Sequence, residues 1–181
     1  GERLPAVASA EIRVVAERFL GRARGGPRDG GGGGGGQALR EEGAFDAAEM
    51  RDAYQERVAT MNDQQRAFVE SALADVRADR QSCVFLEAPA GTGKTYCLNT
   101  LLAGVRGDGK IAVAVATSGI AAIRLTGGRT FHSRFKAPLK LDANTRFNVS
   151  REDDLAALLR EAALIVWDEA AMGHRHLLEG L

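Results

Sequence analysis

Three short runs of consecutive apolar residues lie along the chain, at Cys83–Leu86, Ile111–Ala116 and Leu164–Trp167. Their length and their lack of alternation with polar residues predict strands that are covered on both faces. Elsewhere, apolar residues recur at helical spacing among charged ones. The segments that we expect to be helical are 39–58, 62–78, 96–104, 118–125 and 153–162. Strands that alternate with helices predict an α/β fold with a parallel sheet.

The first sixty residues differ in character from the rest. An amphipathic pattern predicts a helix within residues 1–20, with Ile12, Val15, Phe19 and Leu20 on its apolar side. Residues 21–37 are rich in glycine and include seven consecutive glycines from Gly30 to Gly36, which favours a flexible linker. The alternative is a nucleic-acid-binding tail, supported by Arg22, Arg24 and Arg28. We therefore expect an N-terminal extension over residues 1–60 and one α/β domain over residues 61–181.

Composition and charge restrict the kind of protein further. The 181 residues contain 24 basic and 24 acidic side chains, so a surface for a polyanion must be local. The two cysteines, Cys83 and Cys97, form no disulfide framework or metal pattern, which favours buried thiols in a reducing compartment. We do not expect His174 and His176 near the end of the chain to form a metal site. No apolar run approaches the roughly 18 residues that cross a bilayer, so we expect an intracellular protein.

The segment Ala88-Pro89-Ala90-Gly91-Thr92-Gly93-Lys94-Thr95 has the spacing of a phosphate-binding loop. Gly91 and Gly93 allow the backbone N–H groups to turn inward around phosphate oxygens, and the following helix adds the positive end of its dipole. Lys94 is placed to reach the β- and γ-phosphates, and the Thr95 hydroxyl to ligate Mg²⁺. Ala88 replaces the usual first glycine, and its small side chain should be tolerated. A nucleoside triphosphate is the expected ligand.

Two carboxylates complete this predicted site. Asp168 and Glu169 follow the third apolar run directly, which places them at the carboxyl edge of the predicted sheet, where α/β proteins bind ligands. Asp168 is suited to hold Mg²⁺, and Glu169 to orient and deprotonate the attacking water. Taken alone, the pair also fits a solvated strand end or a helix N-terminus, but the phosphate loop in the same domain favours the catalytic interpretation.

Between the two motifs lie Ala116-Thr117-Ser118-Gly119-Ile120-Ala121-Ala122 and Gly127-Gly128-Arg129-Thr130-Phe131-His132-Ser133-Arg134-Phe135-Lys136. Together with Leu-Ile-Val-Trp-Asp-Glu-Ala-Ala-Met at 164–172, they closely resemble the petite-integration-frequency (Pif-one) DNA helicases of superfamily one. The nearest resemblance is to the type that Helitron transposons carry. The resemblance covers residues 61–181. Met61, Gln64 and Ala171 depart from the usual Leu, Glu and Pro of that family, but none of them removes a catalytic group.

The resemblance implies a RecA-like ATPase domain and further site residues. Gln65 matches a glutamine that reads adenine, which favours ATP; the alternative is a solvent-facing glutamine on a helix. Thr117, His132 and Ser133 match positions that contact single-stranded DNA. The residues themselves add that 109–141 contains no Asp or Glu but six basic side chains, including Arg134 and Lys136, with Phe131 and Phe135 between them. Such a segment suits phosphates and stacked bases. The alternative is that the two phenylalanines belong to the core and the basic groups to a solvated face.

The resemblance also implies an activity: ATP-dependent 5′-to-3′ movement on single-stranded DNA and unwinding of a duplex or fork, in the nucleus. Genome maintenance, which includes DNA repair, recombination and telomere maintenance, and transposition both stay open as roles. The sequence stops twelve residues after Glu169. We therefore expect an incomplete first motor domain that lacks the second RecA-like domain and unwinds nothing by itself. A non-catalytic, transposon-derived remnant that binds nucleotide or DNA is the alternative, and a phosphate-loop ATPase acting on protein is disfavoured by Gln65 and the 129–136 segment.

Overall fold

The computed structural model describes residues 36–138 and 153–172. The helix expected within residues 1–20, most of the glycine-rich linker and the two histidines near the C-terminus lie outside these ranges. No helix in the described ranges is both long and apolar enough to span a bilayer.

A three-stranded parallel sheet in the order β2-β1-β3 forms the centre of the described chain. Its strands are β1 (Ile111–Ala116), β2 (Arg129–Thr130) and β3 (Ala162–Asp168). The register sets Ala116 beside Asp168 at the carboxyl end of the sheet. Two of the three predicted strands are therefore confirmed, as is the α/β class with a parallel sheet.

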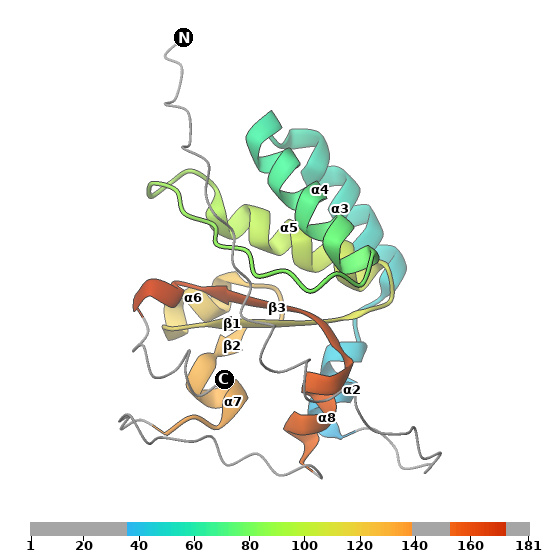
Figure 1. Ribbon diagram of the computed structural model, residues 1–181, viewed down its shortest axis with the longest axis vertical. Helices are drawn as coiled ribbons and strands as arrows, with labels where there is room; N and C mark the ends of the chain where they lie inside the picture. Colours follow the sequence, from blue (N-terminus) through green and yellow to red (C-terminus); the bar gives the residue numbers. More distant parts are fainter. Residues whose placement is uncertain (1–35, 139–152, 173–181) are drawn as a thin grey trace.

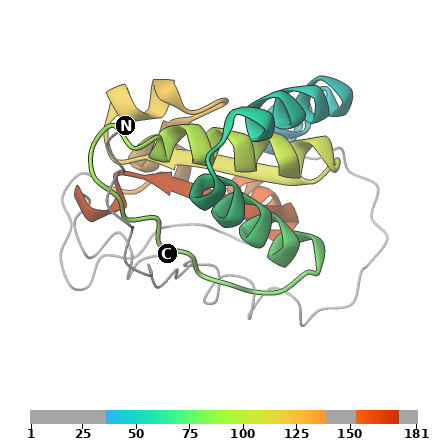
Figure 2. The same ribbon diagram turned by 90° about the horizontal axis from the view of Figure 1, so that it is seen from above.

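Helices cover both faces of the sheet, which gives three layers (Figure 1). On one face lie α3 (Ala47–Thr60), α4 (Asp63–Arg77) and α5 (Lys94–Gly107); on the other lie α2 (Gln37–Gly43), α7 (Phe131–Phe135) and α8 (Asp154–Glu161). The short α6 (Gly119–Arg124) and the 3₁₀ helix η1 (Ala170–Met172) follow the carboxyl ends of β1 and β3. As Figure 2 shows from above, the start of α5 lies at the same end of the molecule as η1.

Alternation along β1 explains how one strand serves both faces. Its alanines at 112, 114 and 116 pack in a cluster with α4, α5 and α6, whereas Val113 and Val115 pack in a second cluster with α7 and α8. The small alanine side chains let α5 approach the sheet closely. Each fully buried large side chain in these clusters stabilises the fold by roughly 1.5–3 kcal/mol.

Four of the α-helices in the described ranges, α3, α4, α6 and α7, begin at a residue whose side chain accepts a hydrogen bond from the first turn. Asn62 caps α4 and forms a reciprocal pair with Gln65, in which each side chain bonds the other residue's backbone N–H. Ser118 caps α6 by accepting a hydrogen bond from the backbone N–H of Ala121. The predicted helices at 62–78, 96–104, 118–125 and 153–162 are confirmed within a few residues.

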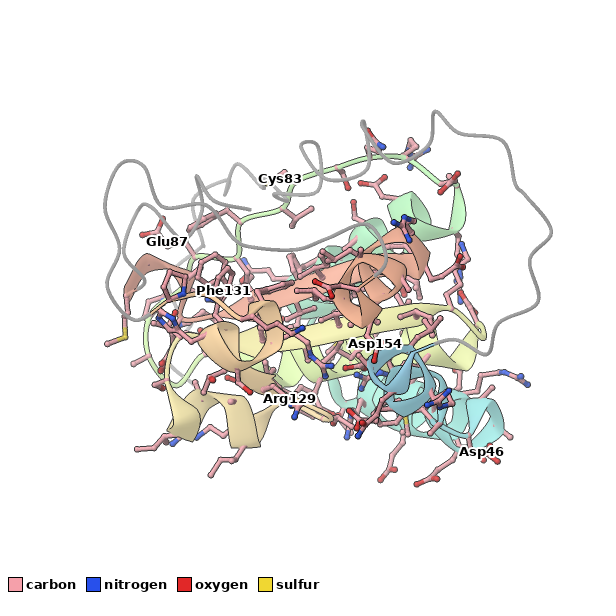
Figure 3. All side chains as sticks on the ribbon, turned by 90° about the horizontal axis from the view of Figure 1, so that it is seen from below. Asp46, Cys83, Glu87, Arg129, Phe131 and Asp154 are labelled. Atoms are coloured by element: carbon pink, nitrogen blue, oxygen red, sulfur yellow. The ribbon has the colours of Figure 1, made fainter. Side chains whose placement is uncertain are left out.

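The strand expected at Cys83–Leu86 is wrong. Residues 81–89 adopt neither helix nor strand, and no ladder joins them to β1 or β3. The segment runs in the same direction as these strands and leads into α5 (Figure 1), and Cys83 and Glu87 mark it in Figure 3. The physical reason is exposure: Phe85 is 43% exposed, so this apolar run is not covered on both faces as a central strand would be.

The single helix expected over residues 39–58 is also wrong, because the chain forms α2 and α3 there. The helix ends after Gly43, and Asp46 begins the next one by accepting hydrogen bonds from the backbone N–H groups of Ala48 and Glu49. Asp, with its short acceptor side chain, favours this N-cap position over a helix interior.

Helices α2 and α3 pack closely on the rest of the domain although they precede residue 61. The Arg51 Nε of α3 donates to the carbonyl of Gly107 at the end of α5, at 2.8 Å. Glu42 of α2 is 3% exposed and pairs with Arg106 and Arg134. The packing of the described chain thus continues across the domain boundary that we expected at residue 60.

Candidate nucleotide-binding site

The segment 88–95 forms a tight loop that leads directly into α5. Gly91 and Gly93 have φ of +78° and +87°, the left-handed region that glycine adopts without strain. Ala88 is not among the residues with positive φ. The first loop position therefore does not need glycine for its backbone conformation, which explains how Ala88 fits there.

Two polar side chains of the loop bond within it. Lys94 Nζ donates to the carbonyl oxygens of Ala88 and Pro89, the latter at 2.9 Å. Thr92 Oγ1 donates to the same Pro89 carbonyl at 2.8 Å. An ammonium group has three N–H donors, so Lys94 retains one for a further acceptor at the loop.

The loop meets the end of β3 through one direct contact. Thr95, on the first turn of α5, donates from Oγ1 to Asp168 Oδ2 at 3.0 Å, across 73 residues of sequence. The other carboxylate oxygen of Asp168 accepts from the backbone N–H of Glu169 at 2.9 Å. A hydroxyl and a carboxylate in contact provide the oxygen ligands that Mg²⁺ prefers.

Glu169 is exposed and has a φ of +56°, which is uncommon for a residue with a side chain. Its carboxylate Oε2 accepts from Ser118 Oγ at 2.8 Å, and its carbonyl accepts from Thr117 Oγ1 at 2.8 Å. The Thr117 hydroxyl in turn accepts from Trp167 Nε1 at 3.0 Å. The connection between β1 and α6 therefore holds Glu169 by both its backbone and its side chain.

Gln65 lies against the phosphate loop. Its side-chain Nε2 donates to the carbonyl of Thr92 at 3.0 Å, and its Oε1 accepts from the backbone N–H of Asn62 at 3.2 Å. The position is thus half-buried at the loop, in contrast to the solvent-facing glutamine that was the alternative.

Burial distinguishes the two cysteines. Cys97, on the buried side of α5, is 3% exposed, and burial raises the pKa of its thiol. Cys83 is half-buried in the extended segment before the loop. In the described ranges, no group of three or more His, Cys, Asp or Glu side chains could hold a metal ion.

The two phenylalanines of the acid-free segment lie in the core. Phe131 and Phe135 are 0% and 1% exposed, and Phe131 stacks on Trp167 with 4.2 Å between ring centroids. Figure 3 shows Phe131 between α7 and β3. The stacking role considered for the two phenylalanines is therefore wrong, and the alternative of core residues is confirmed.

Arg134 also differs from the expectation of a DNA contact. It is 6% exposed and pairs with the carboxylate of Glu42, because α7 turns this side chain inward toward α2. Burial lowers the pKa of the guanidinium, against the opposing attraction of Glu42. Ser133 and Lys136 are exposed, and His132 is half-buried with Nδ1 at 3.2 Å from the carbonyl of Ala137.

Comparison with known proteins decides the family. The model of the family described as PIF1-like helicase matches residues 60–181, well over half of the chain. The chain belongs to this family. The match begins at the residue before the Met61-Asn62-Asp63-Gln64-Gln65 motif and includes the phosphate loop and Asp168-Glu169.

Individual relatives agree with this assignment. The PIF1-like chain is 33% identical over 102 residues to the ATP-dependent DNA helicase PIF4 of Trypanosoma brucei brucei, a match that covers 54% of this chain and 12% of that protein. It is 37% identical over 93 residues to the ATP-dependent DNA helicase Pif1 of a Psychrobacter species, covering 50% and 14%. It is 33% identical over 103 residues to the ATP-dependent DNA helicase Pif1 of Campylobacter jejuni, covering 53% and 23%. The chain thus spans less than a quarter of the length of these curated relatives.

Sequence reasoning did not assign a role to Ser118 or to Glu42 in this PIF1-like chain. Ser118 lies beyond the carboxyl end of β1, next to the end of β3, so the parallel order of the two strands was the available signal. Glu42 pairs with residues 64 and 92 positions away, and no local pattern indicates such partners.

Proposed function

We propose that the protein containing this chain is an ATP-dependent DNA helicase that moves 5′ to 3′ along single-stranded DNA, with residues 61–181 as part of its first RecA-like motor domain. Family membership supports the helicase class. The observation that carries the proposal is the contact between Thr95 and Asp168, because it joins the phosphate loop to the carboxylates at the end of β3.

The donor set at this contact fits Mg²⁺. Thr95 Oγ1 and Asp168 Oδ2 are hard oxygen ligands, and they lie where the loop would present the β- and γ-phosphates. When bound, the ion supplies neutralisation of the charge that develops on the transferred phosphoryl group.

Side chains of this chain supply the remaining steps. The Lys94 ammonium exchanges its contacts with the loop carbonyls for oxygens of the β- and γ-phosphates. Glu169 accepts a proton from a water molecule while the oxygen of that water attacks the γ-phosphorus, and the bond from that phosphorus to the β–γ bridging oxygen breaks. The products are ADP and inorganic phosphate. The backbone N–H groups of the loop and the start of α5 stabilise the anionic oxygens throughout.

Gln65 is the proposed reader of adenine, which makes ATP the preferred nucleotide. Its contacts with Thr92 and Asn62 fix the amide next to the loop, with one N–H of Nε2 left for the base. Because the same contacts join α4 to the loop, the Gln65 side chain would respond both to adenine and to phosphates bound in the loop.

DNA would follow the surface formed by the exposed residues of the 117–136 segment. Ser133 and Lys136 are accessible there, His132 is half-buried, and Thr117 lies at the edge of the nucleotide site. Arg134 has no part in this proposal because it is buried against Glu42. The nuclear location is the corresponding proposal from the family resemblance.

Strand polarity tests the proposal. Purified full-length protein is mixed with fluorescent duplexes that carry a 5′ tail, a 3′ tail or no tail, with ATP and Mg²⁺. We expect unwinding of the 5′-tailed duplex only, and none with a non-hydrolysable ATP analogue. Unwinding that prefers the 3′ tail, or that proceeds equally on blunt duplex, would contradict it.

A further inference from the structure

The two consecutive carboxylates at the end of β3 bond to different elements. Asp168 receives a hydrogen bond from Thr95, at the start of α5, where the phosphates are expected. Glu169 instead receives one from Ser118, the N-cap residue of α6. The carboxylate proposed as the general base is therefore hydrogen-bonded to the β1–α6 connection, whereas Asp168 is hydrogen-bonded to the first turn of α5.

A general base must come within about 2.6–3.2 Å of the proton that it removes. While Ser118 Oγ donates to Oε2 of Glu169, the hydrogen bond occupies this oxygen and fixes the side chain toward α6. The positive φ of Glu169 and the hydrogen bond from Thr117 to its carbonyl hold the backbone in the same arrangement. Both restraints come from neighbouring residues of one short connection.

We propose that Ser118 is a positioning residue that restrains Glu169 and keeps ATP hydrolysis slow when DNA is absent. The inference rests on the proposed function, since it concerns the general base of that reaction. Ser118 acts through Glu169 and need not touch the nucleotide. Its partner in the restraint is Thr117, which is among the proposed DNA contacts.

Through the β1–α6 connection, DNA binding could act directly on the general base Glu169. The Thr117 hydroxyl bridges Trp167 and the carbonyl of Glu169, and its backbone N–H donates to the carbonyl of Asp168 at 3.2 Å. A bound DNA strand that draws Thr117 away from β3 would loosen the backbone of Glu169 and separate its carboxylate from Ser118. DNA-stimulated hydrolysis would then be the release of an existing restraint.

The test must separate this restraint from capping, because Ser118 Oγ also accepts from the backbone N–H of Ala121 at 3.2 Å. Ser118→Ala removes both the cap and the hydrogen bond to Glu169. Ser118→Gly removes the hydroxyl but loses little as an N-cap, and Ser118→Thr keeps the hydroxyl for both roles. ATP turnover of the three full-length variants is measured with and without single-stranded DNA, and thermal melting confirms that each is folded.

Ser118→Ala and Ser118→Gly should both raise the DNA-free turnover number about tenfold, the effect of losing one hydrogen bond to a charged group. Their stimulation by DNA should fall correspondingly, with KM for ATP unchanged, and Ser118→Thr should match the wild type. Unchanged or lower DNA-free turnover in the Ala and Gly variants would overturn the inference. A rise in the Ala variant alone would also overturn it, because that result indicates capping.

The wild-type protein distinguishes this inference from the proposed function. If the wild type hydrolyses no ATP, or hydrolyses it without regard to DNA, both are overturned. If the wild type is stimulated by DNA but the Ser118 variants show its DNA-free rate, the inference alone fails.

Discussion

Gly93 is subject to two independent constraints at the centre of the phosphate loop. Its φ of +87° is a conformation in which a residue with a Cβ is strained. A Cβ added there would also lie 2.7 Å from Nε2 of Gln65, which itself bonds to Thr92. Both the loop conformation and the position of Gln65, the proposed adenine reader, therefore require that residue 93 has no side chain.

Gly93→Ala should weaken nucleotide binding without unfolding the protein. Backbone strain of about 1–3 kcal/mol corresponds to roughly 10- to 100-fold weaker affinity for ATP, provided that the strain falls on the binding conformation. Titration with a fluorescent ATP analogue and Mg²⁺ measures the change. Gly43→Ala is the matched control, because the added Cβ would meet only Ile111 Cδ1 at an ordinary 3.7 Å. Equal affinity of Gly93→Ala and the wild type would contradict the constraint.

Single residues differ in how far the sequence could predict them. The backbone of the 88–95 loop was predictable, because the spacing of Gly91 and Gly93 before Lys94 indicated the turn into a helix that the structure shows. The burial of Arg134 could not be predicted. The residue types at 131–136 fit either a DNA-binding surface or a helix packed on the core, and they do not show which side chains face inward. Orientation on α7 decided that question, and orientation depends on packing against α2 and β3.

At the level of elements, capping residues set the boundaries that hydrophobic periodicity could not. The apolar positions from 39 to 58 fit one long helix, but Asp46 offers its carboxylate to the N–H groups of Ala48 and Glu49 and begins α3 there. The strand expected at 83–86 was wrong for a different reason, which concerns pairing and not capping. A short apolar run is compatible with several backbone states, and only ladder partners make it a strand.

The Asp46 cap predicts a dependence of stability on pH. Hydrogen bonds from the N–H groups of Glu49 and Ala48 lower the pKa of Asp46 below its ordinary value of 3.8. Because the folded-state pKa is the lower one, the stabilisation is present above the unfolded pKa and is lost as pH falls through the folded pKa.

Asp46→Asn should remove this dependence while keeping an acceptor at the cap. Urea unfolding of the purified wild type and variant is compared from about pH 5 to below pH 3. The difference in unfolding free energy between the two proteins should shrink as the pH falls. If this difference in unfolding free energy stays constant over the range, ionisation of the Asp46 carboxylate does not stabilise the fold and the prediction is contradicted.

Across the whole molecule, a buried charge cluster joins elements that are far apart in sequence. Glu42 of α2 accepts from Arg106 of α5 and from Arg134 of α7. Arg106 also donates to the carbonyls of Ala112 and Thr126, and its guanidinium lies 3.7 Å from the ring centroid of Phe45. The cluster connects the end of α5 with the 117–136 segment, whose surface is proposed to bind DNA, through Glu42 and Phe45, which precede the family match.

This cluster is held at an electrostatic cost. Burial raises the pKa of Glu42, although Arg134 and Arg106 oppose that change. Burial likewise lowers the pKa of Arg106. Among the described residues, Arg134 Nε and Nη1 have no hydrogen-bond partner. Glu42 is the carboxylate that hydrogen-bonds to both buried guanidinium groups, those of Arg106 and Arg134.

Glu42→Gln should destabilise the protein by about 3–5 kcal/mol, since it leaves two buried cations without their counter-ion. Guanidinium-induced unfolding of the purified protein measures the loss. Glu41→Gln is the control on the same helix, because Glu41 pairs with Arg129 at 3.5 Å on the surface, with both side chains nearly half exposed. That variant should change stability by less than about 1 kcal/mol. Equal effects of the two substitutions would contradict a structural role for the buried cluster.

The account depends most on the claim that the phosphate loop and the β3 carboxylates form one ATP site whose turnover responds to DNA. The most direct measurement is steady-state ATP hydrolysis by the full-length protein with and without single-stranded DNA, in the wild type and in Lys94→Ala. We predict stimulation by DNA in the wild type and a loss of about 100-fold or more in Lys94→Ala, as for removal of a positioned charge from a transition state. Hydrolysis that is indifferent to DNA, or that survives in Lys94→Ala, would contradict the account.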